Sequence, residues 1–491
     1  MPPHTDPHHE RRWLILAIIG IAQLMVVLDA TIVNIALPSA QADLGFSDES
    51  RQWVITAYAL AFGSLLLLGG RIGDLVGRRR VFVVGLIGFA IASAIGGAAG
   101  SFGVLVAARA LQGVFGALLA PAALGILSTT FTDPAERGKA FGVFGAIAGT
   151  GAAVGLLLGG ILTEVLTWRW CLYVNLAFAI PAAVAGLRML HDGERAERPR
   201  LDIPGTITAT VGLFLLVYGF SHAETDGWGH SLTVACLAVG VALLGIFVLI
   251  QRRVAHPLLP LRVVLDRTRG GAYLAIGISG IAMFGVFLFL TFYLQNTLRM
   301  TPLETGLGFL PMSFAIMLTA TTTSTKILPR TGPRPLVPLG MTLGAIAMII
   351  FTTADVDSSY AMPVLPGLLV MGVGMGLVFA PSFYGATLGV GRHDAGVASA
   401  MVNTSQQVGG SIGVAFLSTM VGNAVAGYAD GRARTPAVMA DAAVHGYTTA
   451  FWWSAGIFAV GAIAVGMLLE SGAPAPGPEG EAVDGDPVMA H

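Results

Sequence analysis

The chain has 491 residues, of which 55% are hydrophobic and only 11% are charged, and its mean hydropathy is +0.76. Soluble proteins carry roughly 25% charged residues, so this composition excludes a soluble multi-domain enzyme. The net charge of −1, without a basic patch among aromatic residues, excludes a nucleic-acid partner. Cys171 and Cys236 both lie in apolar runs, so neither a disulfide framework nor a metal site is expected. The composition therefore indicates an integral membrane protein.

A helix needs about 20 mainly apolar residues to cross the hydrocarbon core of a membrane. Short loops rich in Gly, Pro, Asp and Arg divide the chain into fourteen such segments. The predicted transmembrane helices are 13–37, 52–70, 81–99, 102–127, 140–162, 170–188, 203–221, 231–250, 271–295, 305–324, 336–353, 361–384, 397–421 and 447–469. The first segment follows two arginines as a secretory signal does, but at about 25 residues it is too long for one.

The distribution of Lys and Arg orients these helices, because both residue types are retained on the cytoplasmic side. With a cytoplasmic N-terminus, most of the 27 basic residues fall inside the cell. The exceptions are Arg109, within a predicted helix, and the outside residues Arg51, Arg169, Arg299, Arg432 and Arg434. The 7 tryptophans fall at or near predicted helix ends or in short loops, as an interfacial belt requires. We therefore predict fourteen helices with both termini in the cytoplasm.

A weak internal repeat suggests two related halves. Residues 68–80 resemble residues 323–335, with Gly77 aligned to Gly332, and both copies lie between the second and third helices of a predicted bundle. Such repeats are typical of secondary transporters, whose binding site lies between the halves near the membrane midplane. Chance similarity between Gly- and Arg-rich loops is the alternative reading.

The predicted fold class is all-α integral membrane, with two six-helix bundles and two inserted central helices. The expected parts are a cytoplasmic N-terminal tail (1–12), an N-terminal six-helix bundle (13–200), a two-helix insertion with flanking cytoplasmic loops (201–270), a C-terminal six-helix bundle (271–470) and a disordered C-terminal tail (471–491).

Several motifs together resemble one transporter family. They are Leu28 to Pro38 in the first helix, Gly70 to Arg80 after the second, Arg109 with Gln112 and Gly113 in the fourth, Trp168 to Trp170 with Asn175, Phe379 to Pro381, and Asn403 to Gly410. The chain is similar to the 14-helix drug:proton antiporter branch of the major facilitator superfamily, the EmrB/QacA-like exporters. The resemblance implies the major facilitator fold and covers the chain outside its tails.

The fifth helix departs from the family pattern. The family's antiporter motif there usually carries Gly-Pro followed shortly by Gly-Gly. Here Gly155 is followed by leucine, and Gly159 and Gly160 supply the later pair. We assign Gly151, Gly155, Gly159 and Gly160 to this motif. The missing proline bears on how this helix bends.

Asp29 and Arg109 are the acid and the base that lie well inside predicted helices. Counted at about 1.5 Å per residue, Asp29 lies roughly 13 Å and Arg109 roughly 10 Å from the outer ends of their helices. Their depths agree, so they can pair if the first and fourth helices touch, as the family fold implies. Burial favours a neutral carboxyl, while a nearby cation favours the charged form. We predict a proton-coupling pair; a structural ion pair is the alternative.

Uncharged polar residues form two candidate stripes along predicted helices. Gln112 lies three residues from Arg109, and the positions of Asn403, Gln406 and Gln407 follow a helical period. Together with Asn34, these residues are the predicted lining of a substrate cavity. Amides of this kind also join helices to one another, and the sequence does not separate the two roles. Asn34 is about 140° around the helix from Asp29, so the two need not share a cavity.

Charged residues also gather on the cytoplasmic side after the second helix. The resemblance assigns Gly70, Asp74, Gly77, Arg78 and Arg79 to a cytoplasmic loop that locks the two halves in one state. Anchoring of the topology by positive charge is the simpler explanation.

The sequence therefore predicts proton-coupled efflux of hydrophobic small molecules, cations among them, such as antibiotics or biocides. Proton-coupled uptake of a metabolite and dedicated export of one natural product are the alternatives. No nucleophile, metal cluster or acid pair marks an enzyme, and no Walker motif marks an ATPase. We expect no cofactor and no obligatory protein partner. Abundant Ala, Gly and Arg favour a bacterial inner membrane.

Overall fold

The structure is a computed structural model that describes residues 11–47, 50, 53–131, 133–190, 201–391, 394–433 and 435–470. The predicted C-terminal tail and most of the N-terminal tail lie outside these residues. The same holds for Arg51, Arg195, Arg198, Arg200, Arg392 and Arg434. Within the described ranges the regular structure is helical, which confirms the predicted all-α fold class.

The long helices in chain order are α1 (Arg12–Leu44), α3 (Trp53–Val76), α4 (Arg78–Gly97), α5 (Phe102–Thr130), α6 (Pro134–Val165), α7 (Trp170–Met189), α8 (Ile203–Asp226), α9 (Ser231–Gln251), α11 (Arg267–Gly285), α13 (Leu310–Thr322), α15 (Leu336–Phe351), α16 (Val364–Ala386), α17 (Ala395–Ala429) and α18 (Pro436–Leu468). Shorter helical pieces are α10 (Leu261–Leu265), α12 (Pro302–Gly308), α14 (Leu328–Thr331) and the π-helical turns η1 (Val286–Leu290), η2 (Tyr293–Thr297) and η3 (Thr323–Ile327).

Length and hydropathy identify 12 helices among the described residues that could cross a membrane. A further pair of segments within α6, Glu136–Gly151 and Val154–Val165, passes the same test together and is bent by 44°. The apolar helix α15 is shorter, with 16 residues. The bent pair overlaps the predicted helix 140–162, and α15 overlaps the predicted helix 336–353. The total of fourteen transmembrane helices stays a prediction.

Two helices extend far beyond their predicted ends. α17 has 35 residues and α18 has 33, because the chain continues in helical form past the apolar stretch. The Thr435 side chain accepts a hydrogen bond from the Val438 amide and caps the start of α18. Trp452 and Trp453 consequently lie well inside α18, and their predicted position near a helix start is wrong. Trp168 is buried, whereas the other tryptophans are at least 36% exposed.

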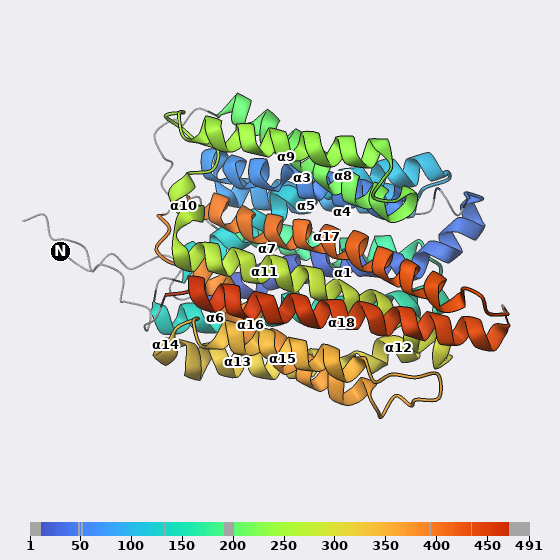
Figure 1. The fold of residues 1–491 in the computed structure, drawn as a ribbon. Coiled ribbons are helices and arrows are strands. Elements are labelled where there is room, and N and C mark those ends of the chain that lie inside the picture. Colours follow the sequence, from blue (N-terminus) through green and yellow to red (C-terminus); the bar gives the residue numbers. More distant parts are fainter. Residues whose placement is uncertain are drawn as a thin grey trace, which may run out of the picture.

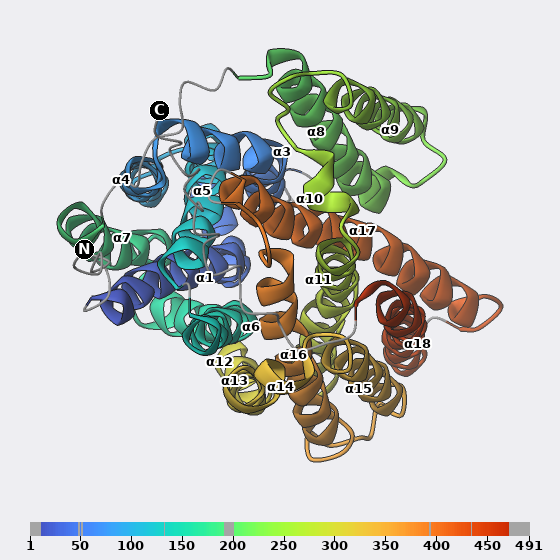
Figure 2. The ribbon, with the colours of Figure 1, turned by 90° about the vertical axis from the view of Figure 1, so that its left-hand side faces the viewer.

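The long helices lie side by side along one axis (Figure 1). α1, α3, α4, α5 and α7 pack on one another, and α11, α15, α16, α17 and α18 form a second set. α6 connects the sets by packing on α1 as well as on α13 and α16, and α17 does so by packing on α3 and α5. Viewed along the helices, α8 and α9 lie outside this arrangement, with α8 against α3 and α17 (Figure 2).

Small residues allow α6 to lie between the two sets. A Cβ at Gly151 would meet Val27 of α1, whereas one at Gly149 would meet Ile316 of α13 and one at Gly145 would meet the backbone of Ala380 in α16. Small residues at such positions permit close helix approach. The glycines assigned to the fifth-helix motif therefore occupy a packing face: Gly155 and Gly159 also lie against α1, and Gly160 is buried.

The cytoplasmic motif differs from its prediction as a loop. α3 runs through Val76 and α4 begins at Arg78, so Gly77 alone separates the helices. Gly77 has φ of +109°, and its aligned residue Gly332, between α14 and α15, has φ of +71°. Glycine adopts such angles without steric cost, which allows an abrupt reversal without a loop. The shared backbone geometry supports the internal repeat.

Candidate functional site

A buried ion pair lies at the centre of the first helical set. Nη1 of Arg109 on α5 donates to Oδ2 of Asp29 on α1 at 2.6 Å. Asp29 is 0% exposed and Arg109 is 1% exposed. The predicted pairing is thus present in the structure. A buried pair of opposite charges is retained only where further hydrogen bonds satisfy both partners.

Amide side chains complete the surroundings of the carboxylate. Nε2 of Gln112 donates to Oδ1 of Asp29 at 2.9 Å, and Nδ2 of Asn175 donates to the same oxygen at 2.6 Å. Gln112 also donates to Oγ of Ser93 at 2.7 Å and accepts from Nη1 of Arg109 at 2.7 Å. Residues of α5 and α7 therefore converge on the carboxylate of α1, and Ser93 of α4 joins the network through Gln112 and Asn175.

The guanidinium has its own anchors on α3. Nε of Arg109 donates to the carbonyl oxygen of Val54 at 3.1 Å, and the guanidinium carbon lies 4.5 Å from the centre of the Tyr58 ring. A cation over an aromatic face gains electrostatic stabilisation, more so when it is desolvated. The arginine is thus fixed from two sides, and its position depends on the planar shape of its side chain.

Close approach of α3 and α5 positions these groups. A Cβ at Gly113 would lie 2.5 Å from the carbonyl oxygen of Tyr58, and one at Gly69 would lie 2.0 Å from that of Ala117. No side chain larger than hydrogen fits at either position. Gly113 therefore brings the helices together at the depth where Arg109 reaches Val54 and Tyr58, and Gly69 does so about three turns further along α3.

We expect Arg109→Lys to lower the transport rate about tenfold or more, although the charge is kept. A lysine ammonium cannot reproduce the forked, planar donation of arginine, so the contacts to Val54, Gln112 and the Tyr58 ring are lost together. The rate is measured in membrane vesicles at matched protein amounts. Arg267→Lys, at an exposed arginine that donates to the carbonyl of Met467, is the control and should transport normally. An Arg109→Lys rate within about twofold of normal would contradict a geometric role.

The residues predicted to line a substrate cavity do not all lie together. Gln112 is 0% exposed and belongs to the hydrogen-bond network of Asp29. Asn34 is exposed on α1, away from that network. Asn403, Gln406 and Gln407 lie half-buried on α17. A Cβ at Gly63 of α3 would meet the Gln407 side chain, so this stripe borders the contact between the two helical sets.

The cytoplasmic motif joins the two sets through Asp74. Its Oδ1 accepts from Nη2 of Arg78 at 2.6 Å and from the backbone amide of Gly396 at 3.1 Å. Gly396 lies in the first turn of α17, where free amides and the helix dipole favour a negative charge. A Cβ at Gly70 would lie 2.6 Å from the carbonyl oxygen of Gly396. Charge and close packing thus hold the two sets together at this end.

The remaining motif arginine has a different contact. Nη2 of Arg79 donates to the carbonyl oxygen of Leu187 at the end of α7, which is within its own helical set. A second bridge between the sets comes from Arg137 on α6. Its Nη2 donates to the carbonyl oxygen of Thr387, just after α16, at 2.8 Å. No sequence pattern predicted this contact, because Arg137 resembles any other arginine between predicted helices.

Burial shows where the two helical sets are in close contact. At the end predicted to be cytoplasmic, residues 394–400 at the start of α17 and 374–387 at the end of α16 are all buried. Asp74, Arg78 and Arg137 lie in this contact.

Besides Gln112, which was predicted to line a substrate cavity, three members of the network around Asp29 were not assigned to it from the sequence: Ser93, Asn175 and Tyr58. Ser93 and Asn175 are 0% exposed, and Tyr58 is 6% exposed. Asn175 had been noted only for its family resemblance. A helical wheel of α7 with Asn175 on the buried face could have singled it out, whereas a serine in a membrane helix carries little information.

The helices form a membrane-protein fold around a buried ion pair, and comparisons with known proteins define its family. The model described as Major Facilitator Superfamily matches residues 19–414, and the chain belongs to this superfamily. It is 50% identical over 464 residues to the puromycin resistance protein pur8 of Streptomyces alboniger, covering 94% of this chain and 92% of that protein. It is 38% identical over 409 residues to the cephamycin export protein CmcT of Amycolatopsis lactamdurans, covering 83% and 84%.

A solved structure shows the same fold. The crystal structure of the human organic anion transporter MFSD10 (TETRAN) aligns with a TM-score of 0.63 and 16% identity, covering 93% of this chain and 99% of that chain. The bacterial relatives confirm the predicted resemblance to the drug-export branch and the predicted location as a multi-pass protein of the bacterial plasma membrane. Members of this superfamily are transporters rather than enzymes.

Proposed function

We propose that the protein exports a hydrophobic small molecule of the antibiotic class in exchange for protons, by alternating access. The buried Asp29–Arg109 pair carries this proposal. Among the acids in the described ranges, Asp29 is the one with 0% exposure. Because a charge at membrane depth is energetically costly, residues of this kind usually mark a functional site. Antibiotic resistance and export proteins among the relatives support the direction of transport.

In this proposal, proton binding is coupled to helix movement because the ionised and the protonated forms of Asp29 make different contacts. With Asp29 ionised, Arg109, Gln112 and Asn175 all donate to it. A proton on Asp29 removes the ionic attraction to Arg109 and places a donor where two donors already point. The network must then rearrange, and helices α1, α5 and α7 move with it. A proton shifts a conformational equilibrium only through such a difference between states.

The moving parts in this proposal are the bundles 13–200 and 271–470, with the insertion 201–270 beside them. Asp74 and Arg78 stabilise the state closed to the cytoplasm through Gly396. Substrate would contact Asn34 on α1 and the stripe of Asn403, Gln406 and Gln407 on α17. The amides supply orientation, and the apolar wall supplies most of the affinity.

Uptake by inside-out membrane vesicles tests the proposed function. With an acidic lumen, we expect puromycin to accumulate and the accumulation to disappear when nigericin collapses the pH gradient. Vesicles without the protein provide the background. Parallel uptake of ethidium would indicate broad selectivity, and puromycin alone would indicate a dedicated exporter. Accumulation that survives collapse of the gradient would contradict proton coupling, and no accumulation of either compound would contradict the proposed substrate class.

A further inference from the structure

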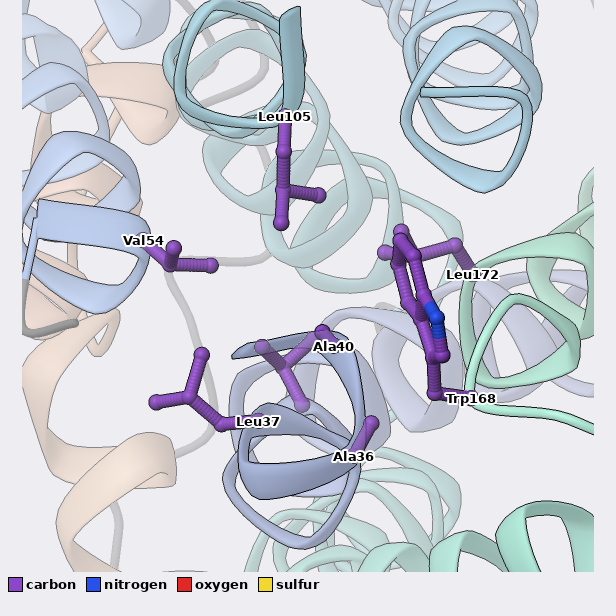
Figure 3. A pocket seen from close by; sticks show the side chains of 8 residues that line it. Ala36, Leu37, Ala40, Val54, Leu105, Trp168 and Leu172 are labelled. Carbon is purple, nitrogen blue, oxygen red and sulfur yellow. The ribbon is translucent and has the colours of Figure 1, made fainter. Parts of the chain in front are cut away.

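A small pocket lies on the outer side of the first helical set. It is shallow and partly open to solvent, it has room for about one water molecule, and its wall is apolar. The lining residues come from α1, α3, α5, α7 and the junction before α7: Val33, Ala36, Leu37, Ala40, Val54, Leu105, Trp168 and Leu172. Leu37, Ala40, Leu105 and the Trp168 ring surround a common space in Figure 3. All of these residues belong to the N-terminal half.

The pocket lies directly outward of the buried ion pair. Val33 follows Asp29 by four residues on α1, Leu105 precedes Arg109 by four on α5, and Leu172 precedes Asn175 by three on α7. One helical turn rises by about 5.4 Å, so the pocket wall begins about one turn outward of Asp29, Arg109 and Asn175. The carbonyl of Val54, also in the wall, accepts from Nε of Arg109.

The Trp168 side chain covers one side of this pocket and is tied to the outer surface. Its Nε1 donates to Oδ2 of Asp43 at 3.0 Å, and Nη2 of Arg169 donates to the same oxygen at 2.9 Å. Nη1 of Arg169 also donates to the carbonyl oxygens of Gly97 and Ala99. The Asp43 side chain is 49% exposed, whereas Trp168 is 5% exposed. The half-exposed carboxylate of Asp43 thus fixes the Trp168 ring at one side of the apolar pocket.

We propose that this pocket is the route by which protons from the outer side reach Asp29, separate from the path of the substrate. This inference rests on the proposed function of Asp29. An apolar constriction conducts when it widens and fills with water, and it closes when water leaves. When Trp168 swings outward, a hydronium ion in the pocket transfers its proton to a carboxylate oxygen of Asp29. An O–H bond forms on Asp29, a water molecule is released, and the ionic attraction to Arg109 ends.

Two substitutions with opposite effects on the pocket test this route. Ala36→Leu fills it, and Leu105→Ala widens it. The control is Ala42→Leu, at an exposed position on the same helix. Proton uptake by the purified full-length protein after a pH jump is followed with a pH dye, and puromycin binding is measured alongside. Because passage depends on pocket width, we expect Ala36→Leu to slow uptake about tenfold and Leu105→Ala to speed it. Puromycin affinity and the number of protons taken up should stay unchanged.

Asp29→Asn separates this inference from the proposed function. If Asp29→Asn takes up as many protons as the unsubstituted protein, Asp29 is not the proton site and the proposed function fails. If Asp29→Asn lacks the uptake attributed to Asp29 while Ala36→Leu and Leu105→Ala both show that uptake at the normal rate, the route alone is wrong. A pocket that belongs to the substrate site would instead reveal itself through weakened puromycin binding in Ala36→Leu at a normal uptake rate, which also overturns the route. Leu105→Ala keeps the test decisive should Ala36→Leu fold poorly.

Discussion

Asp29→Asn is expected to abolish transport driven by a pH gradient, with a loss of about a hundredfold or more, because coupling needs a site whose affinity for protons differs between the two states. Asparagine has nearly the same shape as aspartate, but its side-chain amide does not take up a proton at physiological pH. Gln112 and Asn175 can still donate to its carbonyl oxygen, but its NH2 group faces Nη1 of Arg109, which is itself a donor. The measurement is gradient-driven puromycin uptake in proteoliposomes.

A second variant separates lost coupling from lost folding. Removing one partner of a buried ion pair costs about 3–5 kcal/mol, because the other charge is left unpaired. In Asp29→Asn combined with Arg109→Gln, both charges are absent and the amides can bond to each other. This double variant should fold and exchange labelled for unlabelled puromycin without a gradient, yet remain inactive when a gradient is the driving force. Gradient-driven uptake by Asp29→Asn within about twofold of normal would place proton coupling elsewhere.

Gly70→Leu is expected to prevent closure at the cytoplasmic end. A Cβ at Gly70 would lie 2.6 Å from the carbonyl oxygen of Gly396 and 2.7 Å from Cβ of Ala400. Overpacking of this kind costs about 1–3 kcal/mol, and each 1.4 kcal/mol changes a conformational ratio about tenfold. The cost falls on the closed state alone, so the population shifts toward the state open to the cytoplasm. Transport should fall about tenfold or more.

Spin labels at Val76 and Thr331 can report this shift. Both positions are exposed near the cytoplasmic end, on α3 and α14, and the distance distribution between them should move to longer values in Gly70→Leu. Gly73→Ala is the matched control, because a Cβ there meets only Cγ of Arg78 at 3.8 Å, an ordinary contact. An unchanged distance distribution in Gly70→Leu, with normal transport, would show that the approach of Gly70 to Gly396 is not needed for the cycle.

Some features of the site were predicted from the sequence because they depend on position along one helix. Asp29 and Arg109 stand out as charges within apolar runs, and counting residues from the helix ends places them at similar depth. Their pairing follows once α1 and α5 touch. The motif from Gly70 to Arg80 was found, but its description as a loop was wrong, because a single glycine with positive φ suffices to turn the chain.

Other features depend on how helices rotate and approach one another. Asn175 and Ser93 become partners in the network of Asp29 only because α4 and α7 turn those faces inward. Gln112, predicted to line a substrate cavity, donates to Asp29 for the same reason. The backbone amide of Gly396 carries no sequence signal at all, since every residue but proline has one.

The sequence by itself determined the membrane class, the helical fold and the acid and base within the helices, because hydropathy and charge act locally along the chain. The tertiary structure decided which helices meet, which polar groups surround Asp29, and where the two helical sets touch. It also decided that an apolar pocket lies one turn outward of the ion pair. These features arise from contacts between distant segments, at depths set by small residues such as Gly70 and Gly113, and such contacts are not encoded in any single stretch of sequence.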